Sequence, residues 1–184
     1  LLAHRHQLES VLVQMLKDAI AKRLEQMVRL NKSRVDYLQK FQQMIDEYNA
    51  GSKNIEEFLR QLNTFVKDLD DEEKRGIREG LDEEALTLFD ILTKPEMKLT
   101  QKERAAVKKV AEQLLRRLKE EKLVLDWRKR QQSRADVRLT IEKTLDELPP
   151  PYTRDIYQSK CDVVYQHIFD SYQDANHNFY AMAG

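Results

Sequence analysis

Apolar residues recur at helical spacing along almost the whole chain, and this pattern limits the fold more than any other feature. The clearest stretch has apolar side chains at Ile55, Phe58, Leu59, Leu62, Phe65, Val66 and Leu69. Spacings of three and four residues place these side chains on one face of an α-helix. Only 4 glycines and 4 prolines interrupt the 184 residues, and 35% of the residues are charged. We therefore predict an all-α fold of long helices with solvated outer faces.

The N-terminal quarter continues the pattern in two long stretches. The first contains Leu8, Leu12, Met15, Leu16, Ala19, Ile20, Leu24 and Met27, and the second contains Val35, Leu38, Phe41, Met44, Ile45 and Tyr48. We expect one very long helix or a pair of helices joined near residues 31–33. The apolar stripe of residues 8–27 fits three roles: packing on its own domain, docking on a partner protein, or a coiled coil through residues 8–48. A coiled coil is disfavoured because no strict heptad is sustained.

Capping signals place further helices along the chain. Asp82 stands where an N-cap would precede an apolar run, and Thr100 with Glu103 has the spacing of a capping box. Three prolines at 149–151 end a later helix, because proline lacks an amide donor. Residues 123–125 form the only strand-like piece. We expect an elongated domain of about six helices, with its N-terminal helix over residues 1–30, the main domain over 31–172 and a polar tail over 173–184.

The charges of the chain cancel. With 32 basic and 32 acidic residues, no overall field attracts nucleic acid or an anionic membrane, so any DNA contact must be local. The single cysteine, Cys161, excludes an internal disulfide and is typical of a reducing compartment, which predicts a cytoplasmic protein. The sequence shows neither the apolar run of about 20 residues that a membrane span needs nor a signal-peptide pattern.

Residues that could perform catalysis do not form a recognisable pattern. None of the four glycines belongs to a phosphate-binding loop, which needs a following Lys and Ser or Thr. Asp90, Glu96 and Lys98 have the residue types of a metal-dependent nuclease, but they would straddle a helix end and a proline loop. Cys161 has no histidine pattern beside it and is expected to be a small buried residue. We predict no catalytic residue, no cofactor and no metal site in this chain.

The last third of the chain offers two candidate contact surfaces. The candidates for DNA-phosphate contacts are Arg128, Lys129, Arg130, Arg134 and Arg138, because Arg and Lys donate to phosphate oxygens. A solvated helix face is the other interpretation of this basic cluster. The candidates for a protein interface are Trp127, Tyr157, Tyr165 and Tyr172, since Trp and Tyr are enriched at interfaces. Trp127 could equally fill the core of its own domain.

Several segments resemble one known family. Residues 126–132, 149–154 and 157–172 resemble the C-terminal end of the R (HsdR) subunit of type I restriction-modification enzymes. Residues 45–58 and 80–92 are similar to the same region, so the resemblance extends from about residue 31 to residue 172. Each motif is loose by itself, but their joint occurrence in this order is specific.

The resemblance implies a role within a larger complex. In that family the S subunit reads the DNA target, M methylates adenine, and R translocates DNA with ATP before cutting it. The nuclease and motor domains of R lie upstream of this region, so ATP and Mg are expected there and residues 1–30 would link to the motor. The C-terminal region is implied to dock R onto M and S. No catalytic residue of the family corresponds to a position here, so the parent would be the ATP-dependent deoxyribonuclease and this chain its assembly domain. The alternatives are an autonomous DNA-binding module that uses the basic cluster and a coiled-coil oligomerisation domain.

Overall fold

The computed structural model describes residues 2–182, with side chains from residue 7, and most of these residues are helical. These residues contain eight α-helices and no strand, so the all-α prediction is confirmed. The predicted number of about six helices is wrong. Contacts divide the chain into two compact units, unit 1 over residues 1–78 and unit 2 over residues 79–184.

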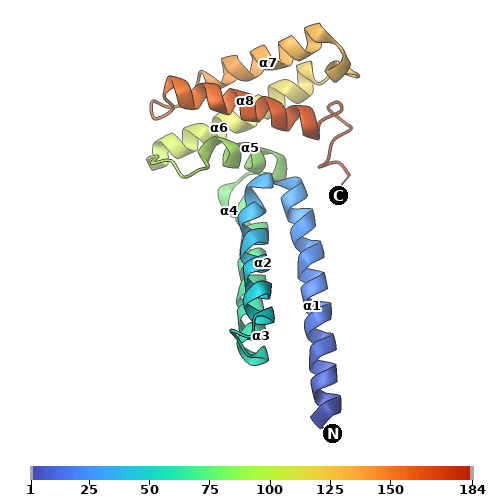
Figure 1. The fold of residues 1–184 in the computed structure, drawn as a ribbon. Coiled ribbons are helices and arrows are strands. Elements are labelled where there is room, and N and C mark those ends of the chain that lie inside the picture. Colours follow the sequence, from blue (N-terminus) through green and yellow to red (C-terminus); the bar gives the residue numbers. More distant parts are fainter. Residues whose placement is uncertain (1, 183–184) are drawn as a thin grey trace. The chain divides into compact units, whose positions relative to one another are not determined.

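Unit 1 consists of α1 (Leu2–Leu30), α2 (Val35–Asn49), α3 (Ile55–Glu73) and most of the short α4 (Arg75–Glu79). A single 3-10 turn, Lys32–Arg34, separates α1 from α2, and the Asn31 side chain caps it by accepting a hydrogen bond from the Ser33 amide at 3.1 Å. The two N-terminal apolar stretches are therefore a pair of helices (Figure 1). Short α4 accounts for one of the helices that periodicity did not predict, because five residues carry too little of a pattern.

The core of unit 1 lies among its three long helices. Its buried apolar side chains are Val13, Ile20, Leu24, Met27, Phe41, Met44, Phe58, Leu62, Phe65 and Leu69. The predicted stripe of α1 is divided, because Ile20, Leu24 and Met27 enter this core while Leu8, Leu12 and Met15 are exposed. At about 100° per residue, the exposed residues fall on a different face of the helix from the buried ones.

Unit 2 contains α5 (Glu83–Thr93), α6 (Gln101–Arg117), α7 (Gln131–Leu145) and α8 (Arg154–Ser171). A π-helical turn, Leu118–Lys122, extends α6, and a 3-10 turn, Trp127–Lys129, precedes α7. Helix α6 packs against α5 and α7, and α8 packs against the same two helices (Figure 1). Both predicted caps are present, since Asp82 accepts from the Ala85 amide at 2.8 Å and Thr100 with Glu103 forms a capping box.

Residues 123–125 do not form the predicted strand-like piece, because they follow the π-helical turn as an irregular segment. Leu123 enters the core of unit 2, and its carbonyl oxygen accepts a hydrogen bond from the Ala175 amide at 2.9 Å. The segment after α8 thus returns along the unit, with an isolated bridge between Tyr172 and Asn178. The Asp174 carboxylate holds its turn by accepting from the amides of Asn176 and His177. None of the described helices has the length and apolarity that a bilayer crossing requires.

Candidate functional site

Trp127 and Tyr172 lie in the core of unit 2, and both side chains are fully buried. The 3-10 turn directs the Trp127 indole inward, where Nε1 donates to the Tyr172 carbonyl oxygen at 3.1 Å. Phe169 contacts the indole edge-on, with ring centroids 5.8 Å apart. The Tyr172 hydroxyl donates to Glu84 at 2.7 Å, and burial with this carboxylate raises the pKa of Tyr172. These two residues therefore offer no accessible area to a partner.

Tyr157 and Tyr165, in contrast, are half-buried on α8. The Tyr157 hydroxyl donates to the Glu142 carbonyl oxygen at 2.9 Å, so its ring is fixed against α7. Desolvation, followed by Cys161 and Asp146, raises the pKa of Tyr157. The Tyr165 ring lies beneath the guanidinium of Arg138, whose Cζ is 5.6 Å from the ring centroid. Among the four predicted interface aromatics, these two retain exposed surface.

The predicted basic cluster is largely engaged within unit 2. Arg128 donates to the Phe169 carbonyl oxygen at 3.1 Å, and Arg134 donates to the Arg128 carbonyl oxygen at 2.7 Å. Arg138 pairs with Glu142 at 2.8 Å and also with Asp162, and these hydrogen bonds raise the pKa of Arg138. Lys129 is exposed but pairs with Asp126 at 2.8 Å. Arg130 is exposed and has no ion pair among the residues that the structure describes.

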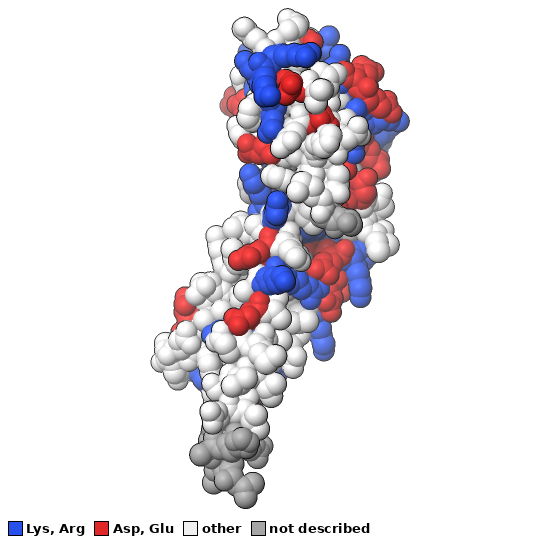
Figure 2. Space-filling view, turned by 90° about the vertical axis from the view of Figure 1, so that its right-hand side faces the viewer, with Lys and Arg blue, Asp and Glu red and all other residues white. Residues whose placement is uncertain are grey.

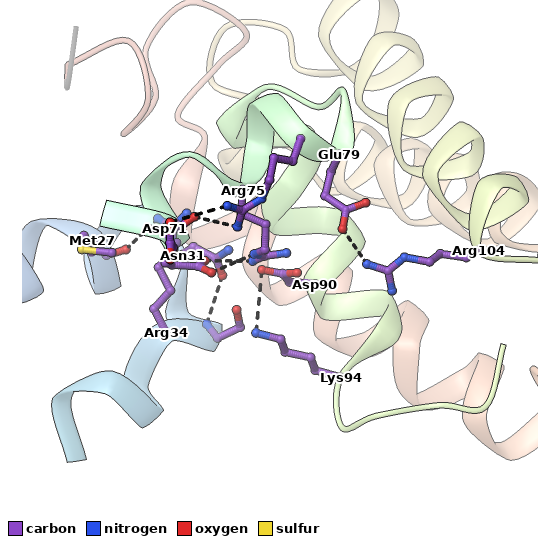
Figure 3. Close-up of polar contacts among 12 residues, drawn as sticks. Met27, Asn31, Arg34, Asp71, Arg75, Glu79, Asp90, Lys94 and Arg104 are labelled. Carbon is purple, nitrogen blue, oxygen red and sulfur yellow. Dashed lines mark hydrogen bonds and ion pairs between the residues drawn. The ribbon is translucent and has the colours of Figure 1, made fainter. Parts of the chain in front are cut away.

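The structure shows a buried ion cluster that sequence reasoning missed. In unit 1, Glu72 accepts from Arg34 at 2.9 Å and from Arg75 at 2.8 Å, and the Arg34 guanidinium also donates to the Met27 carbonyl oxygen at 3.3 Å (Figure 3). Burial alone would raise the pKa of Glu72, but the bonds from Arg75 and Arg34 lower it. Helical spacing places Arg75 next to Glu72 but gives no signal for Arg34, which lies 38 residues from Glu72 along the chain.

The three residues of the nuclease-like pattern do not form a metal site. Asp90 is buried near the end of α5 and lies 3.9 Å from Lys94 (Figure 3). Glu96 and Lys98 are exposed in the following loop. Within the described part of the chain, no three His, Cys, Asp or Glu side chains gather closely enough to hold a metal ion. Cys161 is buried, and desolvation raises the pKa of its thiol, so it is a poor nucleophile at neutral pH.

The most unusual surface belongs to α1. Leu8, Val11, Leu12 and Met15 are 52%, 52%, 64% and 63% exposed, and we call these four residues the α1 stripe. Val13 on the opposite side of the helix is only 5% exposed, so this part of α1 is apolar on two faces. In Figure 2 the surface directly above the grey residues at the bottom of the view is white, so Lys, Arg, Asp and Glu are missing from that part of the visible face. A sequence signal existed, because apolar residues too numerous for one face occupy residues 8–16.

Comparison with known proteins identifies a family for this chain. A family model described as "Type I restriction enzyme HindI endonuclease subunit-like, C-terminal" matches residues 3–173. No curated protein and no solved structure matches the chain significantly. The match covers both units and ends where α8 gives way to the returning segment.

Proposed function

Because this chain belongs to the family of C-terminal domains of type I restriction enzyme HindI endonuclease subunit-like proteins, we propose that it docks the endonuclease subunit onto the methyltransferase and specificity subunits. In this proposal the chain binds protein and performs no chemistry. The ATP- and Mg-dependent motor and the nuclease lie in upstream domains of the parent protein, to which the start of α1 leads. The complex works in the cytoplasm, as the single buried cysteine favours.

The α1 stripe is the observation that carries the proposal. Four large apolar side chains on one helix face are exposed, while the core of unit 1 is already filled from the opposite face. Burial of apolar surface contributes roughly 25 cal/mol per Å², so covering the stripe would favour association. Contiguous exposed apolar surface of this kind is typical of protein-binding sites.

A second contact is proposed on α8, at Tyr157 and Tyr165. Both rings are partly exposed and held in place, Tyr157 by its bond to the Glu142 carbonyl oxygen and Tyr165 by the Arg138 guanidinium above it. Side chains that are already ordered lose little entropy on binding, which favours them as interface residues. Trp127 and Tyr172, the other two predicted aromatics, would support this surface from the core.

A pull-down tests the proposal. The chain is immobilised and incubated with the purified methyltransferase–specificity core, with and without DNA, over a salt series from ~0.1 to ~0.5 M. We expect binding without DNA that persists at high salt, because burial of apolar surface is not screened by ions. The double variant Leu12→Ser/Met15→Ser should lose most of the binding.

The matched control is Ile77→Ser/Leu125→Ser, which removes two large apolar side chains that are 83% and 70% exposed outside the α1 stripe. This control should bind like the unmodified chain. Binding that appears only with DNA and disappears as salt rises would contradict docking and favour the DNA-binding alternative. Self-association that depends on Leu12 and Met15 would instead assign the stripe to a second copy of the chain.

A further inference from the structure

Helix α6 carries three cations on one exposed face. Lys102, Lys109 and Arg116 are exposed, and we call them the α6 ridge. Their spacing of seven residues brings each cation back to nearly the same side of the helix, about 10.5 Å further along its axis. The opposite side is held in the core by Val107, Val110, Ala111, Leu114 and Leu115. The capping box at Thr100 and Glu103 fixes the start of the helix beside Lys102, so the ridge is rigidly presented.

The ridge differs from the other cations of α6 in lacking partners. Arg104 and Lys108 both pair with Glu79, and Arg117 donates to Thr144 at 3.0 Å and to Glu147 at 3.3 Å (Figure 3 for Arg104). Within the described residues, no hydrogen bond or ion pair engages the side chains of Lys102, Lys109 or Arg116. Their charge is therefore available to an external anion.

The α6 ridge is also freer to bind an external phosphate than the basic cluster of Arg128 to Arg138. There, three arginines donate to backbone carbonyl oxygens or carboxylates of their own unit, and Lys129 pairs with Asp126. Using those guanidinium groups for an external phosphate would require breaking bonds that hold α7 and α8. The α6 ridge needs no such change.

A hollow of about 590 Å³ runs beside the ridge, and Lys109 and Arg116 line it together with Asp82 and Glu112. Its mixed charge does not suit a small anion enclosed inside it. The cations at the rim are better placed for an extended polyanion that passes over the helix. Along the helix axis, the distance from Lys102 to Arg116 is roughly 21 Å. This is about the axial length of six nucleotide steps of a DNA strand, at about 3.4 Å each.

We infer that the α6 ridge contacts the phosphates of a DNA duplex that lies along α6, without reading its sequence. Three phosphate contacts predict a weak interaction whose logarithmic affinity falls with the logarithm of salt concentration at a slope of about −2.7. The inference uses no residue of the docking proposal, since the ridge lies on α6, whereas the docking contacts lie on α1 and α8.

The test is a titration of a fluorescent 30-base-pair duplex with the full chain at ~25 mM salt, followed by anisotropy and repeated at rising salt. Lys102→Gln/Lys109→Gln/Arg116→Gln should weaken binding by about tenfold or more and flatten the salt slope. The variant Lys102→Arg/Lys109→Arg/Arg116→Lys should bind like the unmodified chain, because it keeps all three charges.

A matched control removes the same charge elsewhere. Lys22, Lys67 and Lys74 are exposed in unit 1 and also lack ion pairs among the described residues, so their triple Gln variant should retain duplex binding. Equal loss in this control, or wild-type binding by the ridge variant, would overturn the inference. Ridge-dependent binding to polyglutamate but not to the duplex would overturn it too, and would assign the ridge to an acidic protein surface.

Discussion

At the scale of single residues, Lys160 shows how a buried charge is accommodated. Its ammonium group donates to the carbonyl oxygens of Ile91 and Lys94, each at 2.6 Å, at the end of α5. Carbonyl groups in the last turn of a helix lack partners within the helix, so Lys160 replaces the missing donors. Burial lowers the pKa of Lys160 from its ordinary value of 10.5.

Lys160→Met should therefore destabilise the chain by about 1–3 kcal/mol, because it leaves two buried carbonyl groups without donors. Urea unfolding followed by circular dichroism measures the change. Lys143→Met removes an exposed lysine of α7 and should change the free energy of unfolding by less than ~0.5 kcal/mol. An equal effect of both variants would contradict the assigned role.

Lys160 should also make the free energy of unfolding depend on pH. Because its pKa is lower in the folded chain than in the unfolded chain, the unfolded state binds more protons between the lowered pKa and 10.5. The contribution of Lys160 to stability should therefore rise with pH across this window. The difference in unfolding free energy between the unmodified chain and Lys160→Met is expected to widen toward pH 10.5, and a constant difference would contradict the buried charge.

Trp127 permits a third test, since it is the only tryptophan of the chain. Trp127→Phe keeps an aromatic ring but removes the donor to the Tyr172 carbonyl oxygen, and it should cost about 1–3 kcal/mol. Thermal unfolding measures the loss. Affinity for the methyltransferase core, measured well below the unfolding temperature, should be unchanged, because the side chain is fully buried.

The sequence did not predict side-chain contacts between residues that lie far apart along the chain. Trp127 was recognised as either a core or an interface residue, but its acceptor lies 45 residues away and no local pattern indicates it. The basic cluster was visible in the sequence, whereas the carbonyl oxygens and carboxylates that engage it come from the folding of α7 against α8.

At the scale of elements, α1 combines a buried and an exposed apolar face. Leu12→Ser/Met15→Ser should change the free energy of unfolding by less than ~0.5 kcal/mol, because neither side chain belongs to the core. Leu24→Ala, on the buried face, should cost about 2–5 kcal/mol. Chemical denaturation of the two variants distinguishes the faces, and similar losses would show that the α1 stripe packs within its own unit.

Periodicity predicted where the long helices lie, and capping chemistry predicted where α5 and α6 begin. Periodicity did not predict which face of α1 would be covered, because both faces near residues 8–16 are apolar. The residues 123–125 looked strand-like because three apolar residues are consecutive. In the structure only Leu123 is buried, since the π-helical turn before it directs that side chain inward.

At the scale of the whole molecule, the two cores are separate in sequence. The buried apolar cluster of unit 2 takes its members from residues 81–172, and that of unit 1 takes its members from residues 13–69. A fragment of residues 79–184 should therefore fold alone and unfold cooperatively, with the fluorescence of Trp127 reporting the transition. A fragment without a cooperative transition would show that unit 2 depends on the rest of the chain.

Calorimetric titration of the methyltransferase–specificity core with this chain, in the absence of DNA, tests the docking role most directly. We predict saturable binding with a negative heat-capacity change, which is the signature of apolar burial. For Leu12→Ser/Met15→Ser we predict affinity at least tenfold weaker, a loss of about 1.4 kcal/mol or more, and a smaller heat-capacity change. Wild-type affinity and heat capacity in this variant, or no binding by the unmodified chain, would contradict docking through the α1 stripe.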